Sequence, residues 1–180
     1  MNKKKLVIFS GSNKHIQDED LKNNLDFIGK NLNTEKFEIW YGGGNSGLID
    51  IIPKEFYNNK GNVYSIDAKQ FVSDNDEIFG ERYIMDTFND RQEKLINSTD
   101  LYLCLPGGVG TMSELFEVLV NNDVNSKNLA IILYSYNGFY DDIINFIVEN
   151  VREGYIKEKI LSNIFFYKDH EDIVKLLNSS

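Results

Sequence analysis

An acidic side chain directly behind a glycine-rich turn is the strongest candidate for chemistry in this sequence. Glu114 lies three residues after Thr111, the last residue of the turn at 106–111. Glycines let backbone amides approach an anion, and the start of a helix favours negative charge. A carboxylate next to a bound phosphate would lie near the sugar of a nucleotide, where it could stabilise positive charge at the anomeric carbon or activate water. The spacing of Thr111 and Glu114 also fits a capping box, which would make both side chains purely structural.

Arg91 is the second candidate, in a helical stretch that leads into an apolar run at 101–105. A guanidinium can hold a phosphate or orient a sugar through two parallel hydrogen bonds. An arginine on a helix is more often a solvated charge or an ion-pair partner. Together with Glu114 it predicts hydrolysis of the N-glycosidic bond of a nucleoside monophosphate.

Three turns rich in small residues, at 10–13, 42–47 and 106–111, each follow a run that predicts a strand. In a doubly wound parallel sheet, ligands bind outside the carboxyl ends of the strands. One such turn would be an ordinary tight turn, but three at one edge favour a phosphate site. The predicted binding residues are Ser12, Gly43, Gly44, Asn45, Gly107, Gly108, Val109, Gly110 and Thr111.

The turn at 42–47 also matches a dinucleotide-binding pattern, G-x-G-x-x-G, with Asp67 at the end of the next predicted strand. NAD binding therefore remains an alternative. A Walker loop does not, because no Gly-Lys-Ser or Gly-Lys-Thr follows any of the glycine runs.

Strand-like runs alternate with amphipathic stretches along the whole chain, which predicts an α/β, Rossmann-like, doubly wound and mainly parallel sheet with helices on both faces. Residues 1–180 are expected to form one domain. A loop at 67–79 is expected to lie over the carboxyl edge of the sheet. We predict strands at 6–9, 37–41, 62–66, 101–105, 129–134 and 164–167, and helices at 20–32, 48–59, 80–97, 111–121, 140–153 and 171–177.

Composition limits the classes of partner. The net charge of -9 opposes a nucleic-acid footprint, and no apolar run is long enough to span a membrane, so we expect a cytoplasmic protein. The single cysteine, Cys104, lies in an apolar run and is expected to be buried rather than reactive. His15 and His170 have no partners at ligand spacing, so no metal is predicted.

The run at 106–114, Pro-Gly-Gly-Val-Gly-Thr-Met-Ser-Glu, resembles the P-G-G-x-G-T-x-x-E signature of the LOG family of cytokinin riboside 5'-monophosphate phosphoribohydrolases. The similarity extends over nearly the whole chain, through residues 9–12, 41–48, 80–82, 91 and 137–141. The resemblance implies a Rossmann-like homodimer that releases a free base and ribose 5-phosphate from an AMP-like substrate. It implies no cofactor, and it places the catalytic arginine and glutamate at Arg91 and Glu114.

Three departures from the family pattern bear on specificity. Gln92, among the residues expected to face the substrate, stands where the family usually has lysine. Ser73 replaces a glutamate expected on the base side, with Asp74 and Glu77 as possible substitutes, and Asn121 and Asp123 replace the usual Trp and Gln. A nucleotide-binding or sensing module without turnover therefore remains a second alternative.

Overall fold

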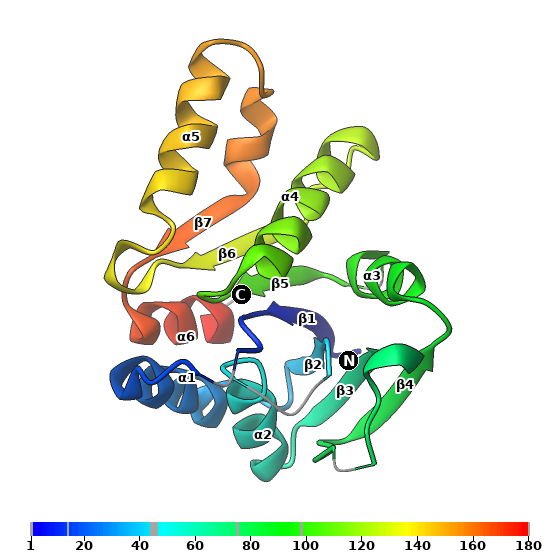
Figure 1. Cartoon of the computed structure of the whole chain (residues 1–180). Helices are drawn as coiled ribbons and strands as arrows, with labels where there is room; N and C mark the ends of the chain where they lie inside the picture. The colour runs from blue at the N-terminus through cyan, green and yellow to red at the C-terminus, as the bar shows by residue number, and fades with distance from the viewer. Residues whose placement is uncertain (1, 14, 44–46, 75, 98, 180) are drawn as a thin grey trace.

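The computed structural model describes residues 2–13, 15–43, 47–74, 76–97 and 99–179. Its centre is a seven-stranded sheet in the order β4-β3-β2-β1-β5-β6-β7, and every pair of neighbours is parallel (Figure 1). The strands are β1 (Lys4–Phe9), β2 (Phe37–Tyr41), β3 (Asn62–Ala68), β4 (Glu81–Met85), β5 (Leu101–Cys104), β6 (Ala130–Tyr134) and β7 (Ile164–Tyr167). The predicted fold class is confirmed.

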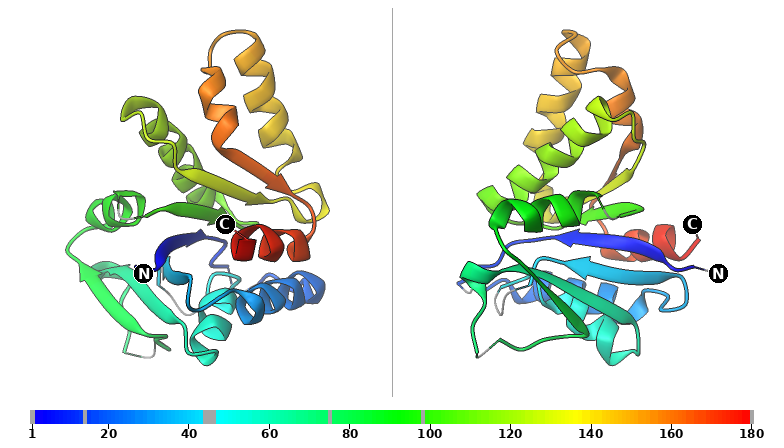
Figure 2. Two further views of the ribbon diagram at one scale, coloured as in Figure 1. Left: turned by 180° about the vertical axis from the view of Figure 1, so that it is seen from behind. Right: turned by 90° about the vertical axis from the view of Figure 1, so that its right-hand side faces the viewer.

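Helices cover both faces of the sheet, as the views in Figures 1 and 2 agree. One face carries α1 (Glu19–Asn31), α2 (Ile51–Asn58) and α6 (His170–Ser179); the other carries α3 (Phe88–Asn97), α4 (Val109–Val124) and α5 (Asp141–Arg152). Short 3-10 turns occur at η1 (Lys69–Phe71), η2 (Tyr136–Gly138) and η3 (Glu158–Asn163). The central strand β1 sends alternate side chains into two apolar cores, Leu6 and Ile8 into one and Val7 and Phe9 into the other, which is why its sequence is continuously apolar.

The prediction of one helix over 80–97 is wrong in its first part. Residues Glu81–Met85 form β4, an edge strand paired with β3, and the helix begins only at Phe88. Gly80 makes the entry to this strand possible, since it has φ +76° and lies directly against the Val63 carbonyl. Hydrogen bonding to β3 thus overrides the helical spacing of the apolar residues.

The predicted loop at 67–79 is also shorter than expected, because β3 continues through Asp67 and Ala68 before η1. In the described part of the chain, no helix is both long and apolar enough to cross a membrane. Cys104 is buried, as predicted, and burial raises the pKa of its thiol.

Candidate active site

The described parts of the three glycine-containing turns meet at the carboxyl edge of the sheet. The Gly11 amide donates to the Pro106 carbonyl at 3.1 Å, which joins the first turn to the third. The Leu48 amide donates to the Gly11 carbonyl at 2.9 Å, which joins the second turn to the first. A Cβ atom on Gly47, where φ is +77°, would lie 2.7 Å from the Ser12 backbone. The first turn therefore contacts both of the others and lies between them.

The third turn leads straight into α4. Gly108 is the N-cap residue and offers no side-chain cap, and Gly108, Val109 and Gly110 are exposed. Because the first amides of a helix have no acceptor within it, this end presents N–H groups to an anion. Gly107 must be glycine, since a Cβ there would lie 2.2 Å from the Thr111 hydroxyl oxygen.

The capping-box alternative for Thr111 and Glu114 does not hold. Since α4 begins at Val109, Thr111 is the third residue inside the helix and is buried, not its N-cap. A capping box, in which two residues exchange side-chain-to-amide hydrogen bonds, is found instead at the start of α3. There the Thr87 amide donates to Asp90 Oδ2 at 3.1 Å, and the Asp90 amide donates to Thr87 Oγ1 at 3.1 Å. The Thr87–Asp90 capping box thus stabilises the start of the helix that carries Arg91.

Arg91 and Glu114 come together although they lie on different helices. Arg91 Nη1 is 3.5 Å from Glu114 Oε1, and the side chains are 11 % and 10 % exposed. Arg91 Nε donates to the Ile66 carbonyl at 3.0 Å, at the end of β3. The guanidinium is thus held between the sheet edge and α4, beside the glycine turn.

Burial alters the acidity of Glu114. Loss of hydration raises the pKa of its carboxyl to about 7, against the opposing influence of Arg91, which favours the carboxylate. A group with such a pKa can accept and release a proton near neutral pH, which suits a general base. Perturbed carboxyls of this kind are enriched at functional sites.

Glycines in the second turn make room for charged side chains. A Cβ on Gly42 would lie 1.5 Å from Arg91 Nη2, and a Cβ on Gly43 would lie 2.3 Å from Asp67 Oδ2. Of the predicted phosphate ligands in this turn, only Gly43 can be placed, because Gly44 and Asn45 lie outside the described residues. The sequence did not predict that Gly42 leaves the space that the Arg91 guanidinium occupies.

Gln92 also contributes to the pair. Its Oε1 accepts a hydrogen bond from Arg91 Nη1 at 2.6 Å, and the residue is buried. The residue expected to face the substrate therefore orients the guanidinium.

A buried three-charge cluster beside the site was missed by the sequence reasoning. Arg82 Nε lies 2.7 Å from Asp67 Oδ2, and its Nη2 lies 2.5 Å from Asp76 Oδ2. Asp67 is therefore engaged by an arginine, which weakens the NAD alternative that needed it for a ribose. A signal was available, since an acid placed directly after the buried Ile66 requires a partner.

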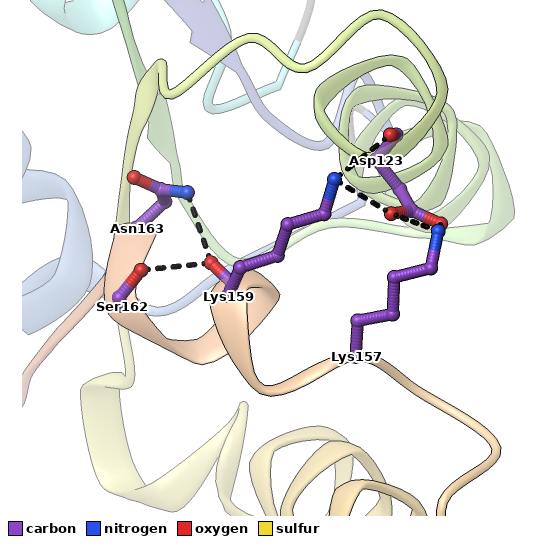
Figure 3. Close-up of polar contacts among 5 residues, drawn as sticks. All are labelled: Asp123, Lys157, Lys159, Ser162 and Asn163. Atoms are coloured by element: carbon purple, nitrogen blue, oxygen red, sulfur yellow. Dashed lines mark hydrogen bonds and ion pairs between the residues drawn. The ribbon is translucent and has the colours of Figure 1, made fainter.

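The other residues that depart from the family pattern lie in two different parts of the structure. Ser73 and Asp74 are exposed on the segment after β3, as is Glu77, and the Ser73 amide donates to Asp76 Oδ2 at 2.9 Å. Asn121 and Asp123 lie within α4, near its far end. Asp123 binds Lys157 at 2.9 Å and Lys159 at 3.0 Å, which ties α4 to η3; Figure 3 shows both lysines pointing at its carboxylate.

Tyr140 hydrogen bonds to the residue directly before the glycine turn at 106–111. Its hydroxyl donates to the Leu105 carbonyl at 2.7 Å, and its amide donates to Ser135 Oγ at 2.9 Å. The residue is fully buried.

Within the described ranges, no group of three or more His, Cys, Asp or Glu side chains could hold a metal ion.

Known proteins resemble this chain in sequence and in fold. A probable cytokinin riboside 5'-monophosphate phosphoribohydrolase, LOG4 of Oryza sativa subsp. japonica, is 25% identical over 167 residues, covering 92% of this chain and 72% of the relative. LOG1 of Arabidopsis thaliana, a cytokinin riboside 5'-monophosphate phosphoribohydrolase, is 26% identical over 176 residues, covering 97% and 82%.

Solved structures share the fold. The molybdenum cofactor carrier protein of Chlamydomonas reinhardtii superposes with a TM-score of 0.76 at 12% identity, over 99% of this chain and 98% of that one. The molybdenum cofactor binding protein of Rippkaea orientalis gives 0.70 at 19% identity, over 99% and 98%. At these identities the likeness is one of fold.

A family model described as possible lysine decarboxylase matches residues 48–177. The matched region includes both Arg91 and Glu114 and the glycine turn between them. This match covers well over half of the chain, and the LOG relatives agree with it, so the chain belongs to this family, the LOG family.

Proposed function

We propose that this protein is a nucleoside 5'-monophosphate phosphoribohydrolase that cleaves AMP or an N6-substituted AMP into the free base and ribose 5-phosphate. The observation that carries the proposal is the Arg91–Glu114 pair, 3.5 Å apart, at the glycine turn that opens α4. The names of the LOG relatives support the same reaction class. The shared fold of the molybdenum cofactor proteins does not choose between activities.

Phosphate binding would orient the substrate. The backbone amides of the N-cap residue Gly108 and of Val109 and Gly110, the first two residues of α4, form the anion site, and the helix dipole adds to it. Arg91 contributes a fixed positive charge, because the Ile66 carbonyl and Gln92 hold its guanidinium. With the phosphate on this turn, the anomeric carbon of the ribose faces Glu114.

The proposed reaction is hydrolysis through an oxocarbenium-like transition state. The bond between the anomeric carbon and the base nitrogen breaks, the base leaves with the electron pair, and a water oxygen bonds to the anomeric carbon. The Glu114 carboxylate stabilises the positive charge on the sugar and takes a proton from the water. The departing base gains one proton from solvent, so charge and atoms balance.

Base release from nucleotides tests the proposal. Purified protein is incubated with AMP, N6-substituted AMP and the other common monophosphates, and free base is measured by chromatography. Glu114→Gln should lower turnover by at least about a hundredfold, as expected for loss of a general base. Glu149→Gln, an exposed glutamate on α5, is the matched control and should leave the rate unchanged. No base from any monophosphate would contradict the proposal.

A binding or sensing module without turnover is the second candidate. Gln92 favours it, because a neutral side chain hydrogen bonds to Arg91 where the family expectation is a lysine, leaving one positive charge fewer at the site. Calorimetry separates the two candidates. A sensor would bind AMP without hydrolysis and would bind equally well in the Glu114→Gln variant.

We also propose that the protein forms a homodimer. Phe116, Val120 and Val124 follow one another at four-residue spacing on α4, and the two valines are 59% and 72% exposed. An apolar stripe of this kind is typical of a helix that packs against a partner. Light scattering of the purified protein should give twice the chain mass, and Val120→Glu should shift the molecule toward monomer.

A further inference from the structure

Two exposed aromatic rings contact each other close to Arg91, and one of them, Phe88, faces its guanidinium. Phe88, the first residue of α3, is 42% exposed, and Phe71, in η1, is 55% exposed. Their ring centroids are 6.0 Å apart and the rings meet edge to face at 88°. Large apolar side chains left open beside a polar site are typical of ligand contacts.

The Phe88 ring is within reach of the reacting groups. The Arg91 guanidinium carbon lies 5.7 Å from the centroid of this ring, inside the range of a cation–π contact. Since Arg91 Nη1 lies 3.5 Å from Glu114, the aromatic pair begins one side chain away from the carboxylate. Phe88 is therefore close enough to contact a base on a sugar that lies against Glu114.

Phe88 also lines a groove. A groove of about 450 Å³ runs between α3 and α4, lined by Phe88, Asn89, Gln92, Glu93, Ser113 and Glu117. Small-molecule sites usually occupy about 300–1,000 Å³, and this groove, which shares Phe88 with the aromatic pair, is of that size. Its amide and hydroxyl groups can hydrogen bond to the edge of a base.

The segment that carries Phe71 is anchored by the buried three-charge cluster. Asp76, five residues after Phe71, binds Arg82 at 2.5 Å, and Arg82 binds Asp67 at the end of β3 at 2.7 Å. The side chains of Arg82 and Asp76 are only 12% and 11% exposed. The chain on the C-terminal side of Phe71 is therefore tied to β3, and the Phe71 ring itself rests against Phe88.

We propose that Phe88 and Phe71 form a stacking platform for the base of the nucleotide. This inference rests on the proposed function for the identity of the ligand, but it concerns binding alone. Stacking on aromatic rings accepts any base face, so the platform selects for an aromatic leaving group without fixing which purine it is. The base would thus be held by contact with the faces of the phenylalanine rings and not by a charged side chain.

Calorimetry with AMP and with ribose 5-phosphate tests the platform, because ribose 5-phosphate keeps the sugar and the phosphate but has a hydroxyl group where AMP carries the base. Both are titrated into the Glu114→Gln protein, in which turnover is suppressed, and into the same protein carrying Phe88→Ala. Phe88→Ala should weaken AMP binding by roughly tenfold, as expected for loss of one stacking partner, and should change ribose 5-phosphate binding by less than about twofold. Phe71→Ala should weaken AMP binding in the same selective way. Phe165→Ala, a phenylalanine on β7 that is 39% exposed, is the matched control and should change neither affinity.

The platform would be overturned if Phe88→Ala left AMP affinity unchanged, or weakened both ligands equally. It would also be overturned if the substitution changed only the oligomeric state, since the groove would then belong to a second copy of the chain. A wild-type protein that releases no base, yet binds AMP more tightly than ribose 5-phosphate through Phe88, would support the platform and end the hydrolase proposal.

Discussion

Two ion clusters in this molecule have the same number of charges and opposite surroundings. In the first, Arg82 lies between Asp67 and Asp76, with side-chain exposures of 12%, 3% and 11%. In the second, Asp123 lies between Lys157 and Lys159, with exposures of 31%, 66% and 41%. Distances are nearly equal, from 2.5 to 3.0 Å, so geometry alone does not distinguish the clusters.

Solvent makes the difference between them. Water and salt screen the exposed cluster and can replace either lysine at little cost. The buried cluster has no such replacement, and loss of one member leaves charges without solvation. The end of β3 is therefore fixed by electrostatics, whereas the far end of α4 is only loosely joined to η3.

Removal of Arg82 should have the largest effect. Arg82→Met leaves two carboxylates close together and largely out of water, and breaking a buried pair in this way typically costs about 3–5 kcal/mol of unfolding free energy. Chemical denaturation monitored by circular dichroism measures the loss. Combining Arg82→Met with Asp67→Asn and Asp76→Asn should recover a large part of it, because no uncompensated charge remains. A triple variant as unstable as the single one would show that shape, not charge, holds this segment.

Glu114 is an intermediate case, as buried as Arg82 but with its cationic partner, Arg91, farther away, at 3.5 Å. Its pKa is raised from 4.5 to about 7 by loss of hydration, so the folded protein keeps a proton that the unfolded chain has released. Stability should therefore fall as pH rises from about 4.5 to 7, by at most about 3 kcal/mol, and the loss should be complete above pH 7.

Comparison of the wild-type protein with Glu114→Gln over this pH range isolates the contribution of that carboxyl. The variant should lack the decline, since glutamine does not titrate. Activity should move in the opposite direction in the wild type, with kcat/KM rising through pH 7 as the carboxylate forms. Parallel stability curves for the two proteins would contradict the assignment.

Much of the sheet could be predicted because alternation of apolar runs and amphipathic stretches is a local signal. The exception, β4, is an edge strand with apolar residues on both sides of its pleat, Tyr83 and Ile84 among them, and nothing in its own spacing distinguishes it from the helix that follows. Its pairing with β3 is a contact between distant residues. Periodicity does not report such contacts.

The candidate site divides in the same way. Arg91 and Glu114 were found from motifs, but their approach depends on how α3 and α4 pack, and the space for the guanidinium depends on Gly42 from a third element. The spacing of Thr111 and Glu114 suggested a cap, whereas the actual cap of this type, Thr87 with Asp90, lies at the start of α3. Local patterns thus identified both residues of the pair but assigned the wrong structural role to Thr111.

The exposed cluster should give the smallest effect. Hydrogen bonds from Lys157 and Lys159 lower the pKa of the Asp123 carboxyl, so any stabilisation is present above its ordinary pKa of 3.8 and is lost as pH falls through the lower folded value. Asp123→Asn should therefore leave the unfolding midpoint at pH 7 nearly unchanged, and high salt should remove what difference remains. Thermal unfolding at low and high salt measures this, with Arg82→Met as the contrasting variant. A salt-independent loss as large as that of Arg82→Met would show that the far end of α4 is anchored as firmly as the end of β3.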